Sequence, residues 1–350
     1  MNIQQLLDLT IQKNASDLHL SVGFPPILRI HGDLFPVPGE APVTPEQIDS
    51  LIQPLLSDIQ KNIYKQVFEL DFSFEFESKA RFRANLYRQK GYPSAALRFI
   101  PHLIPEVDQL GFPSVVNRLI NLKQGFILVT GPTGHGKSTT LASFINKINK
   151  TRAVHVITVE DPIEYMYPPG KSLIEQREMY SDTRSWGNAL RSALREDPDV
   201  VLIGEMRDLE TISSAMTIAE TGHLVFATLH TNSSTQSIDR IIDVFPETQQ
   251  PQIRLQLAST LEAILSLRLV PTIEPGRVLA SEILFATPAV RNIIREAKSY
   301  LIDNIIETSA ELGMQTLERS LAVLVKGGKI SEEVALRFAL RPGLLSKLLK

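Results

Sequence analysis

Eight consecutive residues constrain this chain more than any other segment: Gly131-Pro132-Thr133-Gly134-His135-Gly136-Lys137-Ser138. They match the phosphate-loop pattern, in which a glycine is followed by four residues and then by Gly-Lys and a serine or threonine. The apolar run 126–130 before them predicts a buried strand, and the periodicity of 137–149 predicts a helix after them. In that order, loop N–H groups and a helix N-terminus both point at phosphate oxygens. The segment therefore predicts a nucleoside-triphosphate site.

The candidate nucleotide ligands all lie in this loop or at the start of its helix: Gly131, Pro132, Thr133, Gly134, His135, Gly136, Lys137, Ser138 and Thr139. Among them, Lys137 is expected to reach the outer phosphates and Ser138 to bind Mg²⁺.

The composition narrows the class of protein. A chain of 350 residues has room for two domains of about 150 residues each, and 43% hydrophobic residues suffice for both cores. A net charge of −3 argues against a dedicated nucleic-acid binder. The absence of cysteine excludes disulfides and thiolate metal sites and allows a cytosolic location. We expect no signal peptide at Met1–Leu7 and no membrane span, because no apolar run approaches about 18 residues.

Residues 1–100 predict a small α+β domain with a mixed sheet. Thr44 caps a helix that has Pro45 at its first position, and Gln47 completes a capping box. Five segments with strand character accompany it: Asp17–Ser21, Ile27–His31, Asp71–Phe76, Ala80–Tyr87 and Ser94–Ile100. Proline and glycine then interrupt the pattern over 101–112, which we interpret as the linker to a second domain.

Residues 113–350 predict the nucleotide-binding domain. Apolar runs at Val154–Val159, Val200–Gly204 and Leu224–Leu229 alternate with helical stretches at Thr183–Glu196 and Leu209–Glu220. This alternation predicts an α/β fold with a largely parallel sheet covered on both faces. Residues 288–350 predict a helical C-terminal region, with helices at Ala289–Ala297 and Met314–Val325, a helix end at Gly327-Gly328 and a further helix start at Ser331.

Acidic residues follow two of the predicted strands. Glu205 ends the run Asp199–Gly204, and a carboxylate at that edge of a sheet can lie beside the phosphate loop, where it binds Mg²⁺ or polarises a water molecule. The alternative is a solvated acid at a strand end. Glu160, Asp161 and Glu164 follow the strand 154–159, and such close like charges favour a cation or proton uptake. An exposed acidic turn at Pro162 is the alternative reading.

Two histidines bracket the run Leu224–Leu229. His223 precedes it and His230 follows it, and an imidazole there could donate to a phosphate oxygen. The alternative is a hydrogen-bonded structural histidine, and His230 is the stronger functional candidate. In the first domain, Arg81 and Arg83 share one face of a strand, with Arg88 and Arg98 near them. These guanidinium groups could act in trans on a neighbouring subunit's nucleotide or form surface salt bridges with Glu75 or Glu77.

Together these segments resemble the PilT/PilU branch of the secretion-ATPase superfamily, the retraction motors of type IV pili, over nearly the whole chain. The similar segments occur in the family's order: Ala15–Leu20, Pro25–Arg29, the phosphate loop, Glu160–Glu164, Arg191–Asp199, Gly204–Asp208, Thr221–Thr231, Pro288–Glu296 and Gly313–Leu317. Glu160–Glu164 is similar to the family's aspartate box, Gly204–Asp208 to Walker B and Thr221–Thr231 to the histidine box. Through these matches, Arg195, Arg291 and Arg295 also become candidate functional residues.

The resemblance implies a RecA-like core preceded by a PAS-like domain, assembled as a homohexamer that hydrolyses ATP with Mg²⁺. Glu205 would activate water, with Glu164 as second candidate. Glu160 and Asp161 would organise metal and water, so that Ser138, Glu160 and Glu205 form the metal set. His230 would sense the γ-phosphate, and first-domain arginines would complete the site. The implied partners are an inner-membrane platform protein, through it the pilin filament, and a paralogous retraction ATPase, all reached from the cytoplasmic side of the membrane.

Two features depart from the family pattern. His135 occupies a position where the family usually has a small residue, commonly serine, and we expect an altered rate rather than lost binding. Residues 227–232 and 344–350 resemble the accessory PilU paralogue, whereas 204–208 and 289–296 resemble PilT. The resemblance to PilT favours the retraction motor.

Four other functions stay open from the sequence. They are an accessory retraction ATPase, an assembly or secretion ATPase, a non-hydrolysing nucleotide sensor and a DNA translocase. Assembly ATPases usually carry a four-cysteine zinc module, which this chain lacks. In the favoured reading, rotation of the two domains about 101–112 turns hydrolysis into mechanical work.

Overall fold

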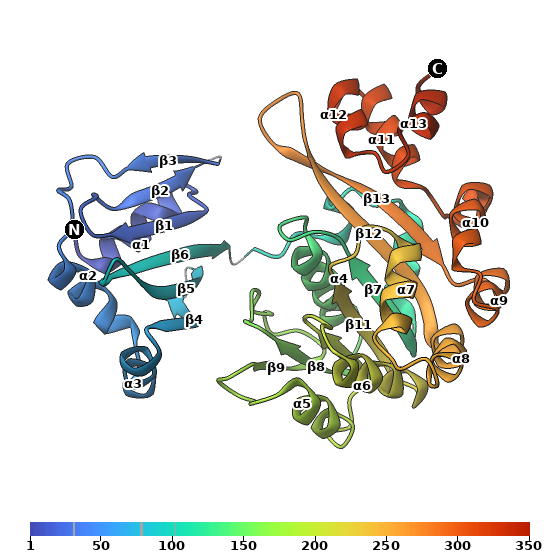
Figure 1. The fold of residues 1–350 in the computed structure, drawn as a ribbon, viewed down its shortest axis with the longest axis horizontal. Helices are drawn as coiled ribbons and strands as arrows, with labels where there is room; N and C mark the ends of the chain where they lie inside the picture. Colours follow the sequence, from blue (N-terminus) through green and yellow to red (C-terminus); the bar gives the residue numbers. More distant parts are fainter. Residues whose placement is uncertain (31, 78–79, 102) are drawn as a thin grey trace. The chain divides into compact units, whose positions relative to one another are not determined.

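The computed structural model describes residues 1–30, 32–77, 80–101 and 103–350, with only the backbone of Pro101. The chain divides into two compact units (Figure 1). The first contains Met1–Leu103 together with Pro162–Met166, and the second contains Ile104–Asp161 and Tyr167–Lys350. Within the described residues, no helix combines the length and apolar character needed to cross a bilayer.

The first unit is an α+β domain built on one six-stranded sheet. Its strands follow the order β3-β2-β1-β6-β5-β4. Their bounds are β1 Asp17–Ser21, β2 Ile27–Ile30, β3 Asp33–Pro36, β4 Glu69–Phe76, β5 Ala80–Gln89 and β6 Tyr92–Pro101. Three helices accompany them: α1 Ile3–Gln12, α2 Pro45–Ile52 and α3 Asp58–Val67. The Thr44–Gln47 capping box at the start of α2 is present as predicted.

For this unit, the predicted type of sheet was wrong and one strand was not predicted. The sheet is not mixed, because every strand pair among the described residues is antiparallel. The edge strand β3 was missed because all four of its residues are exposed, so no burial pattern marks it. The five predicted strands all exist within a few residues of their expected ends; His31, predicted as a strand end, and His102, in the predicted linker, lie outside the described residues.

The second unit contains a seven-stranded sheet in the order β13-β12-β7-β11-β10-β8-β9. All neighbours are parallel except β12 and β13, which confirms the prediction of a largely parallel sheet. The strand bounds are β7 Gly125–Thr130, β8 His155–Glu160, β9 Leu173–Glu178, β10 Val200–Ile203, β11 Leu224–Leu229, β12 Leu261–Pro271 and β13 Arg277–Phe285. The sequence analysis did not identify the β12–β13 hairpin. Strand β12 is buried on both faces, although Glu262, Ser266 and Arg268 interrupt its apolar residues, so its sequence is not the continuous apolar run expected of a fully buried strand.

The helices of this unit are α4 Lys137–Thr151, α5 Trp186–Ala193, α6 Leu209–Glu220, α7 Ser234–Asp243, α8 Gln250–Thr260, α9 Pro288–Arg295, α10 Ile302–Thr308, α11 Leu317–Lys326, α12 Glu332–Phe338 and α13 Pro342–Leu349. Over the described residues of this unit, six of the ten α-helices were predicted individually; α10 and α13 were covered only by the predicted helical C-terminal region, and α7 and α8 were not predicted. Helix α5 starts later than predicted because the Ser185 side chain caps it at Asn188 N–H. Helix α11 starts later because Thr316 caps it at Arg319 N–H. The predicted helix end at Gly327 and start at Ser331 are confirmed.

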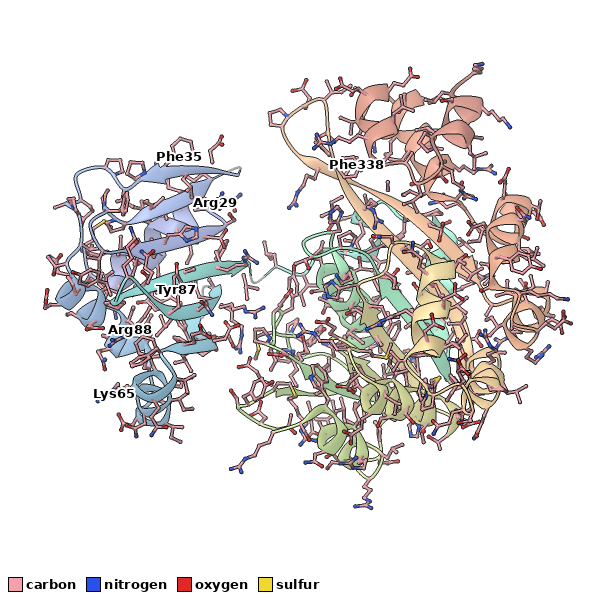
Figure 2. All side chains as sticks on the ribbon, viewed as in Figure 1. Arg29, Phe35, Lys65, Tyr87, Arg88 and Phe338 are labelled. Atoms are coloured by element: carbon pink, nitrogen blue, oxygen red, sulfur yellow. The ribbon has the colours of Figure 1, made fainter. Side chains whose placement is uncertain are left out.

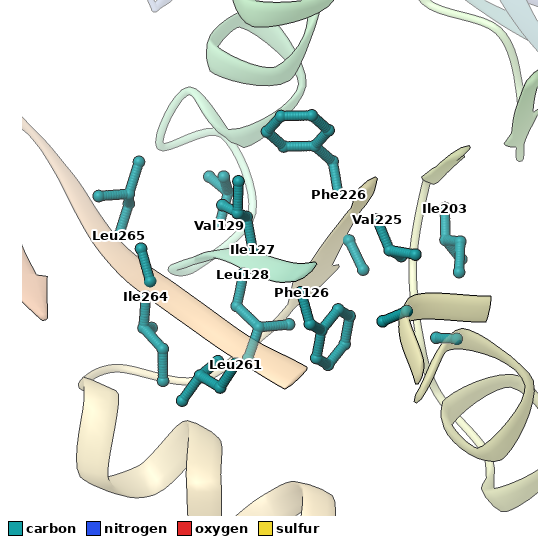
Figure 3. Packing of buried hydrophobic residues seen from close by; sticks show 14 of the residues in the cluster. Phe126, Ile127, Leu128, Val129, Ile203, Val225, Phe226, Leu261, Ile264 and Leu265 are labelled. Atoms are coloured by element: carbon teal, nitrogen blue, oxygen red, sulfur yellow. The ribbon is translucent and has the colours of Figure 1, made fainter. Parts of the chain in front are cut away.

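The core of the second unit lies on both faces of its sheet. Every residue of β7 and β11 is buried, and neighbouring residues on a strand point to opposite faces. Phe226 on β11 points to the face where Phe144 of α4 lies, with 6.1 Å between ring centroids, and Phe126 points to the other face (Figure 3). The prediction of a sheet covered on both faces is therefore confirmed.

Replacement of Phe226 by alanine is expected to destabilise the second unit by about 3–5 kcal/mol, because it removes a fully buried ring and leaves a cavity in close-packed surroundings. Phe24→Ala is the matched control, since Phe24 is 56% exposed and exposed positions change stability by less than about 0.5 kcal/mol. Urea unfolding of both variants, followed by circular dichroism, measures the difference. Equal midpoints for the two variants would contradict this packing argument.

Candidate functional site

The phosphate loop joins the end of β7 to the start of α4, as the sequence predicts. Gly131 has φ +141°, and a Cβ atom on it would lie 2.7 Å from the carbonyl oxygen of Leu267 in β12. Gly136 has φ +90° and forms the N-cap of α4. Side-chain-bearing residues rarely adopt such φ values, so both glycines are required by the backbone. The loop therefore approaches β12 closely and leads directly into the N-terminus of α4.

Lys137 folds back over this loop. Its Nζ donates hydrogen bonds to the carbonyl oxygens of Gly131 at 2.8 Å and of Pro132 at 3.1 Å, and the residue is only 9% exposed. Ser138 follows it at the exposed start of α4. A buried ammonium at the N-terminus of a helix suits the outer phosphates of a nucleotide.

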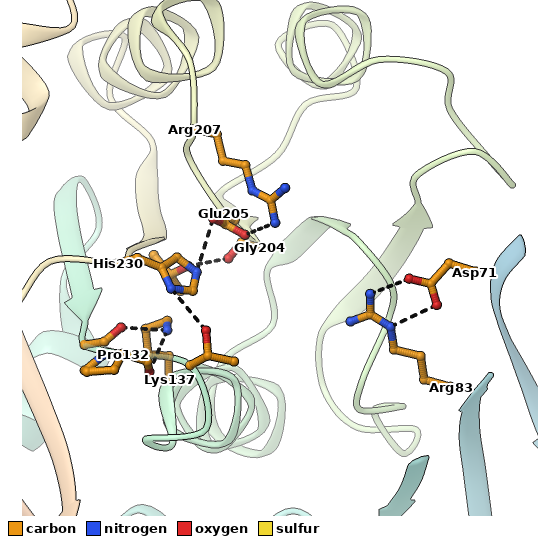
Figure 4. Close-up of polar contacts among 11 residues, drawn as sticks. Asp71, Arg83, Pro132, Lys137, Gly204, Glu205, Arg207 and His230 are labelled. Carbon is orange, nitrogen blue, oxygen red and sulfur yellow. Dashed lines mark hydrogen bonds and ion pairs between the residues drawn. The ribbon is translucent and has the colours of Figure 1, made fainter. Parts of the chain in front are cut away.

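Glu205, His230 and Thr133 meet beside the loop (Figure 4). His230 Nε2 lies 3.2 Å from Glu205 Oε1, and His230 Nδ1 lies 3.4 Å from the hydroxyl of Thr133. Arg207 donates to Glu205 Oε2 at 2.8 Å. The three segments that carry the phosphate loop, the Walker B acid and the histidine box are thus joined through side-chain contacts.

Sheet topology explains this meeting. Strand β11 lies between β7 and β10, and all three are parallel. Thr130 pairs with Leu229, and Ile203 pairs with Ala227. Carboxyl ends of parallel strands share one edge, where α/β proteins bind their ligands. The residues that follow these strands therefore emerge beside one another.

The charge of Glu205 is set by opposing influences. Burial alone would raise the pKa of this carboxyl, but the Arg207 hydrogen bond and the charges of His230, Arg207 and Lys137 outweigh it and hold the pKa below its usual value. Arg207 responds in the opposite direction, since its pKa is raised by Glu205 and, to a lesser degree, by Asp161. Glu205 is consequently an ionised carboxylate at neutral pH, as a proton acceptor must be.

The acidic cluster divides between two places. Glu160 is the last residue of β8, next to β10, and its Oε1 accepts from the Thr158 hydroxyl at 2.6 Å and from Gln176 at 3.2 Å. A Cβ atom on Gly204 would lie 3.2 Å from the Cα of Glu160, so Glu160 lies beside the Walker B segment. Asp161 is exposed and close enough to Arg207 to influence its pKa. Glu164 belongs to Pro162–Met166, which groups with the first unit.

The residues present fit a magnesium ion that is shared with phosphates. No group of three or more histidine, cysteine, aspartate or glutamate residues that could hold a metal occurs in the part of the chain that the structure describes. Mg²⁺ does not need one, since it usually keeps several waters and binds one or two protein oxygens plus substrate phosphates. The hydroxyl of Ser138 and the carboxylates of Glu205 and Glu160 supply oxygens of that kind.

His223 lies at the opposite end of β11 from His230. Its Nδ1 lies 2.9 Å from the Ile218 carbonyl oxygen and 3.1 Å from the Thr221 hydroxyl. These contacts join it to the end of α6, so the structure does not bring His223 to the phosphate loop. Its role in this arrangement is to fasten the turn between α6 and β11.

Three of the first-domain arginines, Arg81, Arg83 and Arg98, share one face of the first unit's sheet, whereas Arg88 lies on the other. Arg83 pairs with Asp71 at 2.7 Å, Arg98 pairs with Asp17 at 2.9 Å, and Arg81 donates to Ser73 at 2.5 Å. Arg83 and Arg98 are also direct cross-strand neighbours. Figure 2 labels Arg88, whose guanidinium lies 4.4 Å from the centre of the Phe68 ring. The pairing of Arg83 with Asp71 was not foreseen; the sequence analysis considered Glu75 and Glu77.

Three further arginines lie away from the loop. Arg291 of α9 donates to the carbonyl oxygens of Ala286, Ala258 and Ser259 and to Glu262 at 2.6 Å. It therefore fixes the start of α9 to the end of α8. Arg295 is exposed and donates to the Asn292 side chain at 3.5 Å, and Arg195 is exposed after α5.

Sequence analysis missed Arg207 and Arg268 as individual site residues. Arg268 is 6% exposed and donates to the Asn232 side chain at 2.8 Å and to the Leu267 carbonyl oxygen at 2.8 Å. It therefore links β12 to the loop that carries His230. The available signal was the single charged residue in the largely apolar segment 263–271, because a charge is seldom buried without a partner.

Comparisons with known proteins place this site in a family. Residues 77–277 match the model of the type II/IV secretion system protein family. The chain is 46% identical over 335 residues to the type IV pilus retraction ATPase PilT of Pseudomonas aeruginosa, covering 96% of this chain and 97% of that protein. The chain belongs to the type II/IV secretion system protein family. As a member of this family it is a phosphate-loop ATPase.

Two other comparisons refine the position within the secretion family. A crystal structure of the pilus retraction motor PilT with bound ADP matches with a TM-score of 0.92 and 45% identity, covering 99% of both chains. PilU of Pseudomonas aeruginosa, a type IV pilus ATPase, is 36% identical over 97% of this chain and 89% of its own length. Over a similar span, this chain is therefore more similar to PilT than to PilU.

Proposed function

We propose that this chain is the ATP-hydrolysing motor that retracts type IV pili. The observation that carries the proposal is the contact of Glu205 with His230, and of His230 with Thr133 of the phosphate loop. This arrangement puts a carboxylate that can accept a proton beside a loop built for phosphates. The 46% identity to a retraction ATPase over nearly the full length of both chains supports pilus retraction as the work that hydrolysis drives.

Phosphoryl transfer to water needs positioning and charge neutralisation more than covalent chemistry. Within the nucleotide-binding segment 131–139, the backbone N–H groups from Thr133 onward and the Lys137 ammonium would hold the β- and γ-phosphates. Glu205 would orient the attacking water and take its proton, with Glu164 as the second candidate, and His230 would contact the γ-phosphate. Glu160 and Asp161 would order metal and water. When bound, Mg²⁺ supplies positive charge to the phosphate oxygens, and Ser138, Glu160 and Glu205 would hold it.

The proposal extends to assembly. We expect a homohexamer in which Arg81, Arg83 and Arg98 act on the nucleotide of a neighbouring subunit. The first domain (1–100) and the ATPase domain (113–350) would rotate about the linker (101–112) as nucleotide is cleaved. An inner-membrane platform protein would pass the movement to the pilus, with a paralogous retraction ATPase beside it. The motor would then work at the cytoplasmic face of the membrane.

Complementation tests this function. In a piliated strain that lacks its retraction ATPase, the full chain is expected to restore twitching, and Lys137→Ala is expected to fail at equal expression. A second strain that lacks only its accessory ATPase provides the control. Rescue of the second strain alone would assign the chain to the accessory role, and rescue of the first by Lys137→Ala would contradict an energy source at this loop.

A further inference from the structure

His135 makes a contact that its loop position does not require. Its Nδ1 accepts a hydrogen bond from the backbone N–H of Leu269 in β12, at 3.0 Å. Strand β12 pairs with β7 only as far as Ser266 opposite Thr130. Beyond that point the neighbouring strand has ended, and a backbone N–H without a strand partner must be satisfied by another acceptor. His135 provides that acceptor from within the phosphate loop.

Three consecutive residues of β12 contact both loops of the site. The carbonyl oxygen of Leu267 faces Gly131 so closely that a Cβ atom would lie 2.7 Å from it. Arg268 donates to the side chain and the carbonyl oxygen of Asn232, two residues after His230. Leu269 completes the set through His135. Residues 267–269 therefore form a support that fixes the phosphate loop on one side and the histidine loop on the other.

We propose that His135 is a positioning residue, whose neutral imidazole ties the phosphate loop to β12 and holds the loop in its nucleotide-binding shape. This inference rests on the proposed function of the loop and adds a regulatory property to it. A serine at this position is too short to span from the loop to Leu269 in the same way. The hydrogen bond to Leu269 therefore depends on the histidine at this position.

Protonation removes the tie, because a doubly protonated imidazole has no acceptor nitrogen. The charged groups that face His135 are Arg268 of β12, Arg277 of β13 and Lys137 of α4, and Arg277 also reaches the carbonyl oxygen of Gly134 at 3.5 Å. Burial lowers the pKa of His135, and these three positive charges lower it further. The neutral form consequently dominates at neutral pH, and the tie is lost only as the pH falls below the ordinary histidine range.

Equilibrium binding of ADP by the full chain, measured by calorimetry without turnover, tests the inference. His135→Ser is expected to weaken ADP binding about two- to tenfold at neutral pH, the effect of one lost hydrogen bond. His135→Asn keeps an acceptor oxygen near the position of Nδ1 and is expected to bind within about twofold of the wild type. At an acidic pH below the lowered pKa of His135, the wild type should fall toward His135→Ser, whereas His135→Asn should retain its advantage.

The phosphate groups of ADP titrate in the same way in all three experiments. Differences in ADP affinity between the three proteins therefore report the side chain at position 135 alone. Melting temperatures are recorded beside each titration. If His135→Ser and the wild type bind equally at both pH values, or if His135→Asn binds as weakly as His135→Ser while its melting temperature is unchanged, the inference is overturned. Lys137→Ala tests the nucleotide site independently of His135. If Lys137→Ala binds ADP as tightly as the wild type, the proposed site itself is refuted. If Lys137→Ala loses ADP binding while His135→Ser binds ADP normally, only the role of His135 is refuted.

Discussion

Glu205→Gln is expected to lower the rate of ATP hydrolysis by about 10²–10⁴-fold, which is the usual contribution of a positioned general base. Glutamine keeps the size of the side chain and can still accept the hydrogen bond that Arg207 donates at 2.8 Å. It cannot take a proton from the attacking water. Steady-state phosphate release at saturating ATP and Mg²⁺ measures the effect, and ADP affinity should change little because the phosphate loop is intact.

Glu247→Gln is the matched control for this substitution. Glu247 is an exposed residue in the loop between α7 and α8, outside the site, and the same chemical change there should leave turnover unaltered. The wild-type rate should also fall as the pH drops through the pKa of Glu205. That pKa is held below its usual value, so the carboxylate stays ionised at neutral pH and is protonated only in more acidic solution. Near-normal turnover by Glu205→Gln would show that another carboxylate, and not Glu205, is the general base.

Lys137→Ala is expected to weaken ADP and ATP binding by about 10–100-fold, since hydrogen bonds to charged groups contribute about 1.5–3 kcal/mol. The ammonium is buried against the carbonyl oxygens of Gly131 and Pro132, and it is the positive charge that the loop itself supplies to bound phosphates. Turnover should fall below detection, because the same charge balances the phosphates in the transition state.

Lys147→Ala provides the comparison for the lysine, because Lys147 lies on the same helix, α4, away from the loop. Calorimetry with ADP, followed by phosphate release with ATP, should separate the two variants clearly. Equal affinities for Lys137→Ala and Lys147→Ala would mean that nucleotide binds elsewhere in the chain, and the roles assigned to the phosphate loop would then fail together.

Local sequence patterns predicted most of the second unit. The runs at 126–130 and 224–229 are apolar throughout, and they became the fully buried strands β7 and β11. Capping residues placed helix starts well where they were recognised, as at Thr44 and Ser331. Helix lengths were less accurate at α5, where the unrecognised cap at Ser185 sets the first turn. Patterns did not identify β3, β9 or the β12–β13 hairpin: β3 is exposed throughout, β9 is mostly exposed or half-buried, and β12 is buried on both faces.

The sequence by itself determined the phosphate loop, the parallel sheet and the identity of the residues that follow its strands. These properties are local, since they depend on residue type, spacing and the period of burial. Only the tertiary structure decided that His230 lies between Glu205 and Thr133 and that His135 binds β12. Such contacts join segments far apart in the chain, and strand order sets them, which no spacing along the sequence encodes.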